Sequence, residues 1–181
     1  MNIDGVFSTL LIGDVTNYIA LKFAIDCAEK GLPVWYISTE PIQELPHTII
    51  KPCREVLKLI TFIYLQTYSD LIKHLNGIQN WRNIPRIIIL KNFEIYSKIK
   101  ADYSSAKAAY LCVILLNTMS YVKQKLNSPA YLLVFNASLD TEDLNKLQVL
   151  YDMYFRKCYS QSEYENDDNL VKCIEEEISS I

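Results

Sequence analysis

Short apolar runs alternate with segments of helical periodicity along most of this chain, and this alternation constrains its fold more than any other feature. Phe7 to Ile12 is an apolar run that ends in Gly13, and Thr16 to Lys30 carries apolar residues at helical spacing. Gly31 closes this segment, and Val34 to Ser38 follows as a run rich in β-branched and aromatic residues. The N-terminal part of the chain therefore predicts a complete strand–helix–strand unit.

The same alternation continues toward the C-terminus. Leu57 to Leu65 predicts a strand, Ser69 to Leu75 a short helix, and Arg86 to Leu90 a strand buried on both faces. A long helix is expected from about Ser104 to Leu126, followed by a strand from Tyr131 to Phe135. Because parallel strands need crossover connections, we predict an α/β fold with a mostly parallel sheet and helices on both faces.

The C-terminal segment predicts a different arrangement. Met153 to Gln161 and Leu170 to Glu175 look like strands, and the polar cluster Glu165 to Asn169 lies between them. We expect an antiparallel β-hairpin at about 153–176, at the end of a single domain that spans residues 1–181.

The composition limits the classes of function. Half of the 181 residues are hydrophobic, which is typical of a packed globular protein, and a net charge of −3 argues against tight nucleic-acid binding by this chain alone. The five cysteines are scattered without a Cys-x-x-Cys pair, so we expect reduced thiols and no metal site. No basic N-terminal leader precedes an apolar run, and no stretch suggests a membrane span, so a soluble intracellular protein is expected.

The turn after the first strand stands where a phosphate-binding loop would have the pattern Gly-x-x-x-x-Gly-Lys-Ser/Thr. Gly13 keeps the first glycine, but Tyr18 occupies the second glycine position, Ile19 the lysine position and Ala20 the hydroxyl position. Asp14 adds negative charge where phosphates would lie. The pattern predicts no nucleotide cofactor, and an ordinary strand-to-helix turn is an equally good interpretation of Gly13 alone.

Two further positions bear on nucleotide chemistry. The strand Arg86 to Leu90 is followed by Lys91, where an active P-loop enzyme has an aspartate that positions Mg²⁺. Glu40 follows the second strand, at a place where a carboxylate can activate water. Without a bound nucleotide Glu40 has no substrate, so we expect no catalytic residue.

Several segments taken together resemble the small RecA-paralogue-like ATPase subunit of the animal Shu complex, the Swsap family. The resemblance spans roughly Phe7 to Glu175. The segments that carry it are Leu10-Leu11-Ile12-Gly13, Ala24-Ile25-Asp26-Cys27-Ala28, Leu32-Pro33-Val34-Trp35-Tyr36-Ile37-Ser38, Pro41-Ile42-Gln43-Glu44-Leu45-Pro46, Ile87-Ile88-Ile89-Leu90, Phe93-Glu94-Ile95-Tyr96, Ala108-Ala109-Tyr110-Leu111 and Leu115-Leu116-Asn117-Thr118.

The resemblance implies a RecA-like P-loop core and a nuclear protein of homologous recombination repair. It implies a heterodimer with a SWIM-domain zinc-finger protein that helps a RecA-type recombinase, contacted directly or through the partner, to assemble on single-stranded DNA. Loss of the motif residues at Tyr18, Ile19, Ala20 and Lys91 implies a non-catalytic subunit. Two alternatives stay open. One is a weak ATPase that uses Lys91 and Glu40, and the other is an unrelated doubly wound scaffold, whose sheet would lack a strand inserted between the first strand and Arg86 to Leu90.

Ala108 to Leu116 is a run of nine apolar residues inside a predicted helix, although a helix on a sheet needs only one apolar stripe. Either neighbouring helices cover its far side or a partner does. Tyrosine is enriched at interfaces and the chain has 13 of them, so candidate partner contacts are Tyr18, Tyr96, Tyr103, Tyr110 and Leu116. Lys91, Lys98 and Lys100 are candidates for a basic patch that touches single-stranded DNA within a complex.

Overall fold

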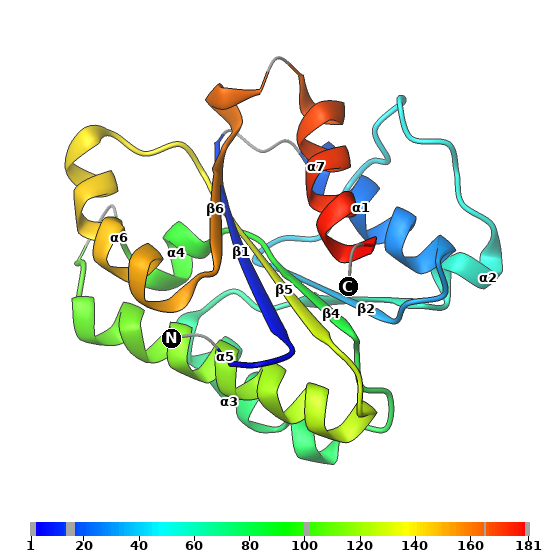
Figure 1. Cartoon of the computed structure of the whole chain (residues 1–181), viewed down its shortest axis with the longest axis horizontal. Coiled ribbons are helices and arrows are strands. Elements are labelled where there is room, and N and C mark those ends of the chain that lie inside the picture. The colour runs from blue at the N-terminus through cyan, green and yellow to red at the C-terminus, as the bar shows by residue number, and fades with distance from the viewer. Residues whose placement is uncertain (1–2, 14–16, 100–101, 165, 180–181) are drawn as a thin grey trace.

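A computed structural model of the protein describes residues 3–13, 17–99, 102–164 and 166–179 (Figure 1). Within them the chain forms one six-stranded sheet in which every pair of neighbouring strands is parallel. The spatial order is β3-β2-β4-β5-β1-β6. The strands are β1 (Val6–Ile12), β2 (Val34–Ser38), β3 (Ile60–Tyr64), β4 (Ile87–Leu90), β5 (Ala130–Asn136) and β6 (Lys157–Ser160).

Helices cover both faces of the sheet (Figure 1). One face packs against α3 (Tyr68–Asn76), α4 (Phe93–Ser97), α5 (Ser105–Leu126) and α6 (Thr141–Tyr154). The other face packs against α1 (Asn17–Glu29), α2 (Arg54–Leu57) and α7 (Asp167–Ser179). Two short 3-10 helices, Ile78–Asn80 and Gln161–Glu163, complete the described elements. The α/β class predicted from the alternation of strands and helices is confirmed.

The central strands are buried on both sides, as their apolar sequences predict. Every residue of β2, β4 and β5 is buried. Successive side chains of a strand point to opposite faces, so Trp35 and Ile37 enter the core under α3 to α6, whereas Val34 and Tyr36 enter the core under α1. A strand with two apolar neighbours and two covering layers needs apolar residues at every position.

The strand order distinguishes between two of the folds that the sequence left open. β5 lies between β1 and β4, and Leu133 of β5 is in register with both Thr9 and Ile89. An inserted strand at this place is the RecA-like arrangement, and the unrelated doubly wound scaffold was expected to lack it. The scaffold alternative is therefore wrong with respect to strand order.

The predicted C-terminal β-hairpin at 153–176 is wrong. β6 pairs in parallel with β1, with Cys158 opposite Leu10, and residues 170–175 belong to α7. Leu170, Val171 and Ile174 are buried together against the α1 side of the sheet. Their spacing of one and three residues fits one face of a helix, a pattern that a short apolar run shares with a strand.

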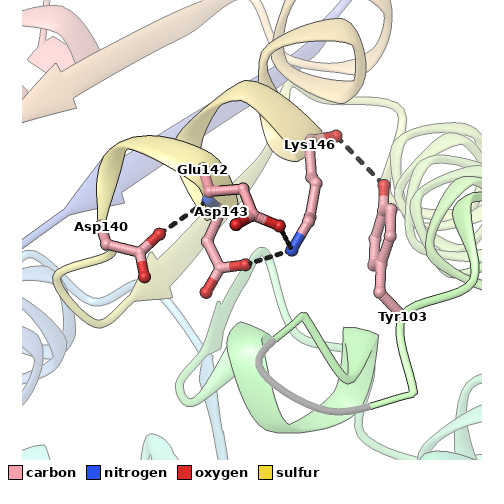
Figure 2. A network of polar contacts seen from close by, with 5 residues as sticks. All are labelled: Tyr103, Asp140, Glu142, Asp143 and Lys146. Atoms are coloured by element: carbon pink, nitrogen blue, oxygen red, sulfur yellow. Dashed lines mark hydrogen bonds and ion pairs between the residues drawn. The ribbon is translucent and has the colours of Figure 1, made fainter.

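The sequence reasoning also missed helix α6. It begins after Asp140, whose carboxylate accepts a hydrogen bond from the Asp143 backbone N–H at 2.9 Å (Figure 2). Met153, placed in a strand from its sequence, lies in the last turn of this helix. The connection from β5 through α6 to β6 is the crossover that a parallel β6 requires.

Neighbouring helices of the same domain cover the long helix α5. The interpretation that these helices account for its apolar run is therefore confirmed. It contacts β1 and β5 on the sheet and packs beside α3, α4 and α6. Among residues 108–116 only Tyr110 is exposed. Among the helices of the described residues, α5 is the one whose length and composition meet the criteria for a membrane span. Its buried residues belong to the hydrophobic core under α3 to α6, which accounts for its apolar composition.

Candidate functional site

The turn after β1 lies at the carboxyl edge of the sheet, where open α/β proteins bind ligands. The Gly13 backbone N–H donates to the carbonyl of Asn136 at the end of β5, at 3.0 Å. A Cβ on Gly13 would lie 2.5 Å from both the Cβ and the Oε1 of Gln161. Glycine is therefore required here because Gln161 packs directly against the turn. Asp14 lies outside the described residues.

The positions that a P-loop would use for lysine and a hydroxyl side chain face the core. Ile19 and Ala20 lie in the first turn of α1 and are both 0% exposed. They pack in the hydrophobic cluster beneath α1, and Tyr18 lies half-buried at its margin. Side chains that point into an apolar core do not present a charge or a hydroxyl group to a ligand.

Lys91 is held at the end of β4 and is largely buried, with 8% of its surface exposed. Its backbone N–H donates to the Ile37 carbonyl of β2 at 2.9 Å. Burial lowers the pKa of the Lys91 ammonium group, and the nearby Glu94 carboxylate acts in the opposite direction. The basic side chain at this position therefore stands in a partly desolvated setting beside a carboxylate.

Glu94 in α4 joins this edge of the sheet to the segment after β5. Its Oε2 accepts a hydrogen bond from the Ala137 backbone N–H at 3.0 Å. Asn136 donates its side-chain amide to the Ala137 carbonyl at 2.8 Å, whereas its Oδ1 is buried and has no hydrogen-bond partner. Sequence reasoning missed both residues. For Asn136 the available signal was a polar residue directly after the predicted strand Tyr131 to Phe135. Glu94 lies within α4, four residues after the end of β4, and had no such signal.

These side chains surround a small crevice of about 290 Å³. Its volume is just below the range for small-molecule pockets, roughly 300 to 1,000 Å³. The ammonium group of Lys91, the carboxylate of Glu94 and the amide of Asn136 are suited to binding a small polar ligand. The crevice is lined by Gly13, Lys91, Asn92, Glu94, Phe135, Asn136 and Ala137.

Glu40 does not line this crevice, although it follows β2 as the sequence placed it. Its side chain is exposed, and its backbone carbonyl accepts a hydrogen bond from the Ser38 hydroxyl at 2.6 Å. Of the two residues of the weak-ATPase alternative, Lys91 lines this crevice and Glu40 does not. Among the described residues no group of three His, Cys, Asp or Glu side chains is placed to hold a metal ion.

Some of the residues predicted to contact a partner are buried, and others are exposed. Tyr96 and Leu116 are 1% and 2% exposed, so as surface contacts these two predictions are wrong. The Tyr96 hydroxyl donates to the Leu65 carbonyl at 2.6 Å, which explains its place in the interior. Tyr103 is half-buried and donates to the Lys146 carbonyl at 3.1 Å. Tyr110 is 49% exposed on α5 and is available to a partner.

The three lysines do not form the expected basic patch within the described chain. Lys91 is buried, Lys98 is exposed, and Lys100 lies outside the described residues.

A larger open groove, which sequence reasoning missed together with α6, lies between that helix and the edge strand β6. It encloses about 1130 Å³, and we call it the α6–β6 groove. Its walls include Gln148, Tyr151 and Asp152 of α6, Cys158 and Ser160 of β6, and Glu163 of the following turn.

No family model matches this chain, and no curated protein sequence matches it.

Proposed function

We propose that this chain is a non-catalytic, RecA-like subunit of a Shu-type recombination mediator in the nucleus. Its role is to bind a SWIM-domain zinc-finger protein as a heterodimer and to support assembly of a RecA-type recombinase on single-stranded DNA. One combined observation carries the proposal: the sheet has the RecA-like strand order, whereas Ile19 and Ala20 are fully buried at the lysine and hydroxyl positions.

A subunit without nucleotide chemistry has to act through its surface. Tyr110 offers such a surface on α5, next to Tyr68 of α3, whose hydroxyl donates to the Lys107 carbonyl of α5 at 3.4 Å. Aromatic side chains contribute large contact areas at protein interfaces. The net charge of −3 supports contact with DNA only as part of the complex, because phosphate binding needs an excess of basic groups.

The weak-ATPase alternative rests on Lys91, which lines the crevice at the carboxyl edge of the sheet. A nucleotide that binds only the folded state would stabilise the chain by about 2.7 kcal/mol at a hundredfold excess over its dissociation constant. We expect no change in melting temperature with ATP and Mg²⁺. A reproducible rise would favour the enzyme over the mediator subunit.

The direct test is to purify the tagged chain from its own cells and to identify the accompanying proteins by mass spectrometry. We expect a SWIM-domain zinc-finger protein in stoichiometric amount. Tyr110→Ala should reduce its recovery, whereas Tyr64→Ala, at an exposed tyrosine of the edge strand β3, should not. Monomeric chain without such a partner, together with a melting temperature that rises with ATP, would overturn the proposal.

A further inference from the structure

Three buried polar side chains line the crevice at the carboxyl edge of the sheet. Lys91 follows β4, Glu94 lies in α4, and Asn136 ends β5. These residues are 8%, 9% and 1% exposed, respectively. Burial of charged groups costs free energy, and charged side chains that are buried together at a cleft are candidates for a ligand site.

The side chain of Asn136 is held in one orientation. Its Nδ2 donates to the Ala137 carbonyl at 2.8 Å, and its backbone carbonyl accepts the Gly13 N–H at 3.0 Å. The hydrogen bond of Nδ2 fixes the direction of Oδ1, which is buried and has no hydrogen-bond partner among the described residues. A buried acceptor without a partner destabilises the fold, and a donor that enters the crevice would recover this free energy.

The carboxylate of Glu94 is anchored at the same place as Asn136. Its Oε2 accepts the Ala137 backbone N–H at 3.0 Å, so that Ala137 binds both side chains through its two backbone groups. An ionised carboxylate has room for several hydrogen bonds, and the one from Ala137 leaves it able to accept others. Glu94 and Asn136 therefore bring acceptor oxygens to the crevice beside one residue.

Lys91 brings the opposite charge. Its backbone N–H donates to the Ile37 carbonyl at 2.9 Å, which anchors the residue at the end of β4. The ammonium group has three donor hydrogens, so it can bind an anionic group and keep the contacts that it makes within the protein. The Glu94 carboxylate is near enough to act on this ammonium group electrostatically. The crevice thus offers one positive charge, one negative charge and an additional acceptor.

The two charges decide the class of ligand that fits. A simple anion would be repelled by Glu94 and has no donor for the Oδ1 of Asn136. A simple cation would be repelled by the ammonium group of Lys91. A zwitterion complements both charges and has donors for the unpartnered oxygen. The volume of about 290 Å³ restricts it to a small molecule.

We propose that this crevice binds a small zwitterionic α-amino acid, such as glycine or alanine. The ammonium group of the ligand donates to the Oδ1 of Asn136 and to the Glu94 carboxylate, and the carboxylate of the ligand accepts from Lys91. Hydrogen bonds between charged groups are stronger than neutral ones, which favours this ligand over an uncharged amide. The site does not rest on the proposed recombination function, because it needs neither a partner protein nor DNA.

The first experiment titrates the isotope-labelled full chain with glycine and follows its backbone amide signals by nuclear magnetic resonance. We expect the Gly13 and Ala137 amides to shift with a dissociation constant on the order of 1 mM, because so small a ligand makes few contacts. The Gly77 amide, at the end of α3, should not shift. Acetate, methylammonium and acetamide each lack at least one of the two charges and should bind about tenfold more weakly. Equal binding of any of these three, or no shift with glycine, would overturn the proposal.

A pair of lysine variants tests the contact with the ligand carboxylate. Lys91→Met removes the ammonium group but keeps an unbranched side chain at the buried position, so glycine should bind about tenfold more weakly. Lys125→Met, at an exposed lysine of α5 that does not line the crevice, should bind glycine as the wild type does. Undiminished binding by Lys91→Met would contradict the proposed site. If Lys91→Met does not fold, the comparison of ligands on the wild type still decides.

Discussion

The imidazole ring of His74 and the indole ring of Trp81 meet edge to face, with their centroids 4.4 Å apart. Trp35 of β2 completes the cluster, 5.2 Å from His74 and 4.8 Å from Trp81. The Nε2 atom of His74 is buried without a hydrogen-bond partner. Burial lowers the pKa of His74 because the charged imidazolium loses its hydration in this aromatic setting.

The lowered pKa of His74 predicts how stability depends on pH. The unfolded chain binds the imidazole proton more readily than the folded chain does, with a pKa of about 6.5. Its neutral form therefore stabilises the fold above that pH, and this contribution falls as the pH drops below it. We expect the urea midpoint to decrease between pH 7.5 and pH 5 by less in His74→Phe than in the wild type.

The control for this effect is His47→Phe, at the exposed histidine of the loop after β2. It should keep the wild-type dependence on pH. Equal pH dependence of His74→Phe and the wild type would show that the buried imidazole is not the group that titrates.

The burial of Ile19 predicts that the phosphate-binding lysine cannot simply be restored. In Ile19→Lys an ammonium group would enter the core beneath α1, where Ile19 is 0% exposed. We expect a loss of about 3 kcal/mol or more in the free energy of unfolding and no ATP-dependent rise in melting temperature. Urea unfolding followed by circular dichroism measures the first quantity, and a thermal melt with ATP and Mg²⁺ measures the second.

The matched control is the reverse exchange, Lys22→Ile, one turn further along α1. Lys22 forms a partly exposed ion pair with Asp26 at 2.9 Å, and such a pair within a helix contributes about 0.5 kcal/mol. A variant Ile19→Lys that was as stable as Lys22→Ile and bound ATP would refute our interpretation of the first turn of α1.

The strands were largely predictable from the sequence because central parallel strands are apolar at every position. Val34–Ser38 has the predicted bounds, and Ala130–Asn136 extends the prediction by one residue at each end. The predicted strand Leu57 to Leu65 is wrong at its start, because Leu57 ends helix α2 and β3 begins at Ile60. The larger errors lie at the C-terminus. There, Leu170 to Ile174 is too short an apolar run to separate a strand from a helix, and its partners in α1 are distant in the sequence.

The candidate site was less predictable than the fold. The sequence indicated that Ile19 and Ala20 lack the chemistry of a phosphate loop, but not that both side chains face the core. The crevice around Lys91 depends on the contact of Glu94 with the Ala137 backbone, across 43 residues of sequence. Long-range contacts of this kind follow from the strand order, which periodicity alone does not specify.

Loss of the side-chain hydroxyl should lower the free energy of unfolding more at Tyr96 than at Tyr110. Tyr96→Phe removes the hydroxyl that donates to the Leu65 carbonyl at 2.6 Å, leaving that acceptor without its partner. We expect a loss of about 1 kcal/mol in unfolding free energy, measured by urea denaturation. Tyr110→Phe, at an exposed position, should cost less than about 0.5 kcal/mol. A cost at Tyr110 as large as that at Tyr96 would disprove this division into core and surface tyrosines.

At the start of α6, variants can measure separately how helix capping and side-chain charge contribute to stability (Figure 2). Asp140 accepts the Asp143 backbone N–H, whereas Lys146 forms ion pairs with the buried Asp143 and the exposed Glu142. Its hydrogen bonds to these two carboxylates raise the pKa of Lys146. Asp140→Ala should cost about 1 kcal/mol, which lowers the melting temperature by about 2–4 °C in a chain of this size.

Asp140→Asn keeps a capping oxygen and should melt within about 1 °C of the wild type, because asparagine caps helices as well as aspartate does. Lys146→Ala should cost less than Asp140→Ala, since Lys146 is only half-buried and one of its two ion pairs, with Glu142, is exposed and contributes little. Tyr103 donates to the Lys146 backbone carbonyl, which alanine retains. Differential scanning calorimetry of the three variants tests this order. If Asp140→Asn lost as much stability as Asp140→Ala, the negative charge of Asp140 and not its hydrogen bond would stabilise the start of α6.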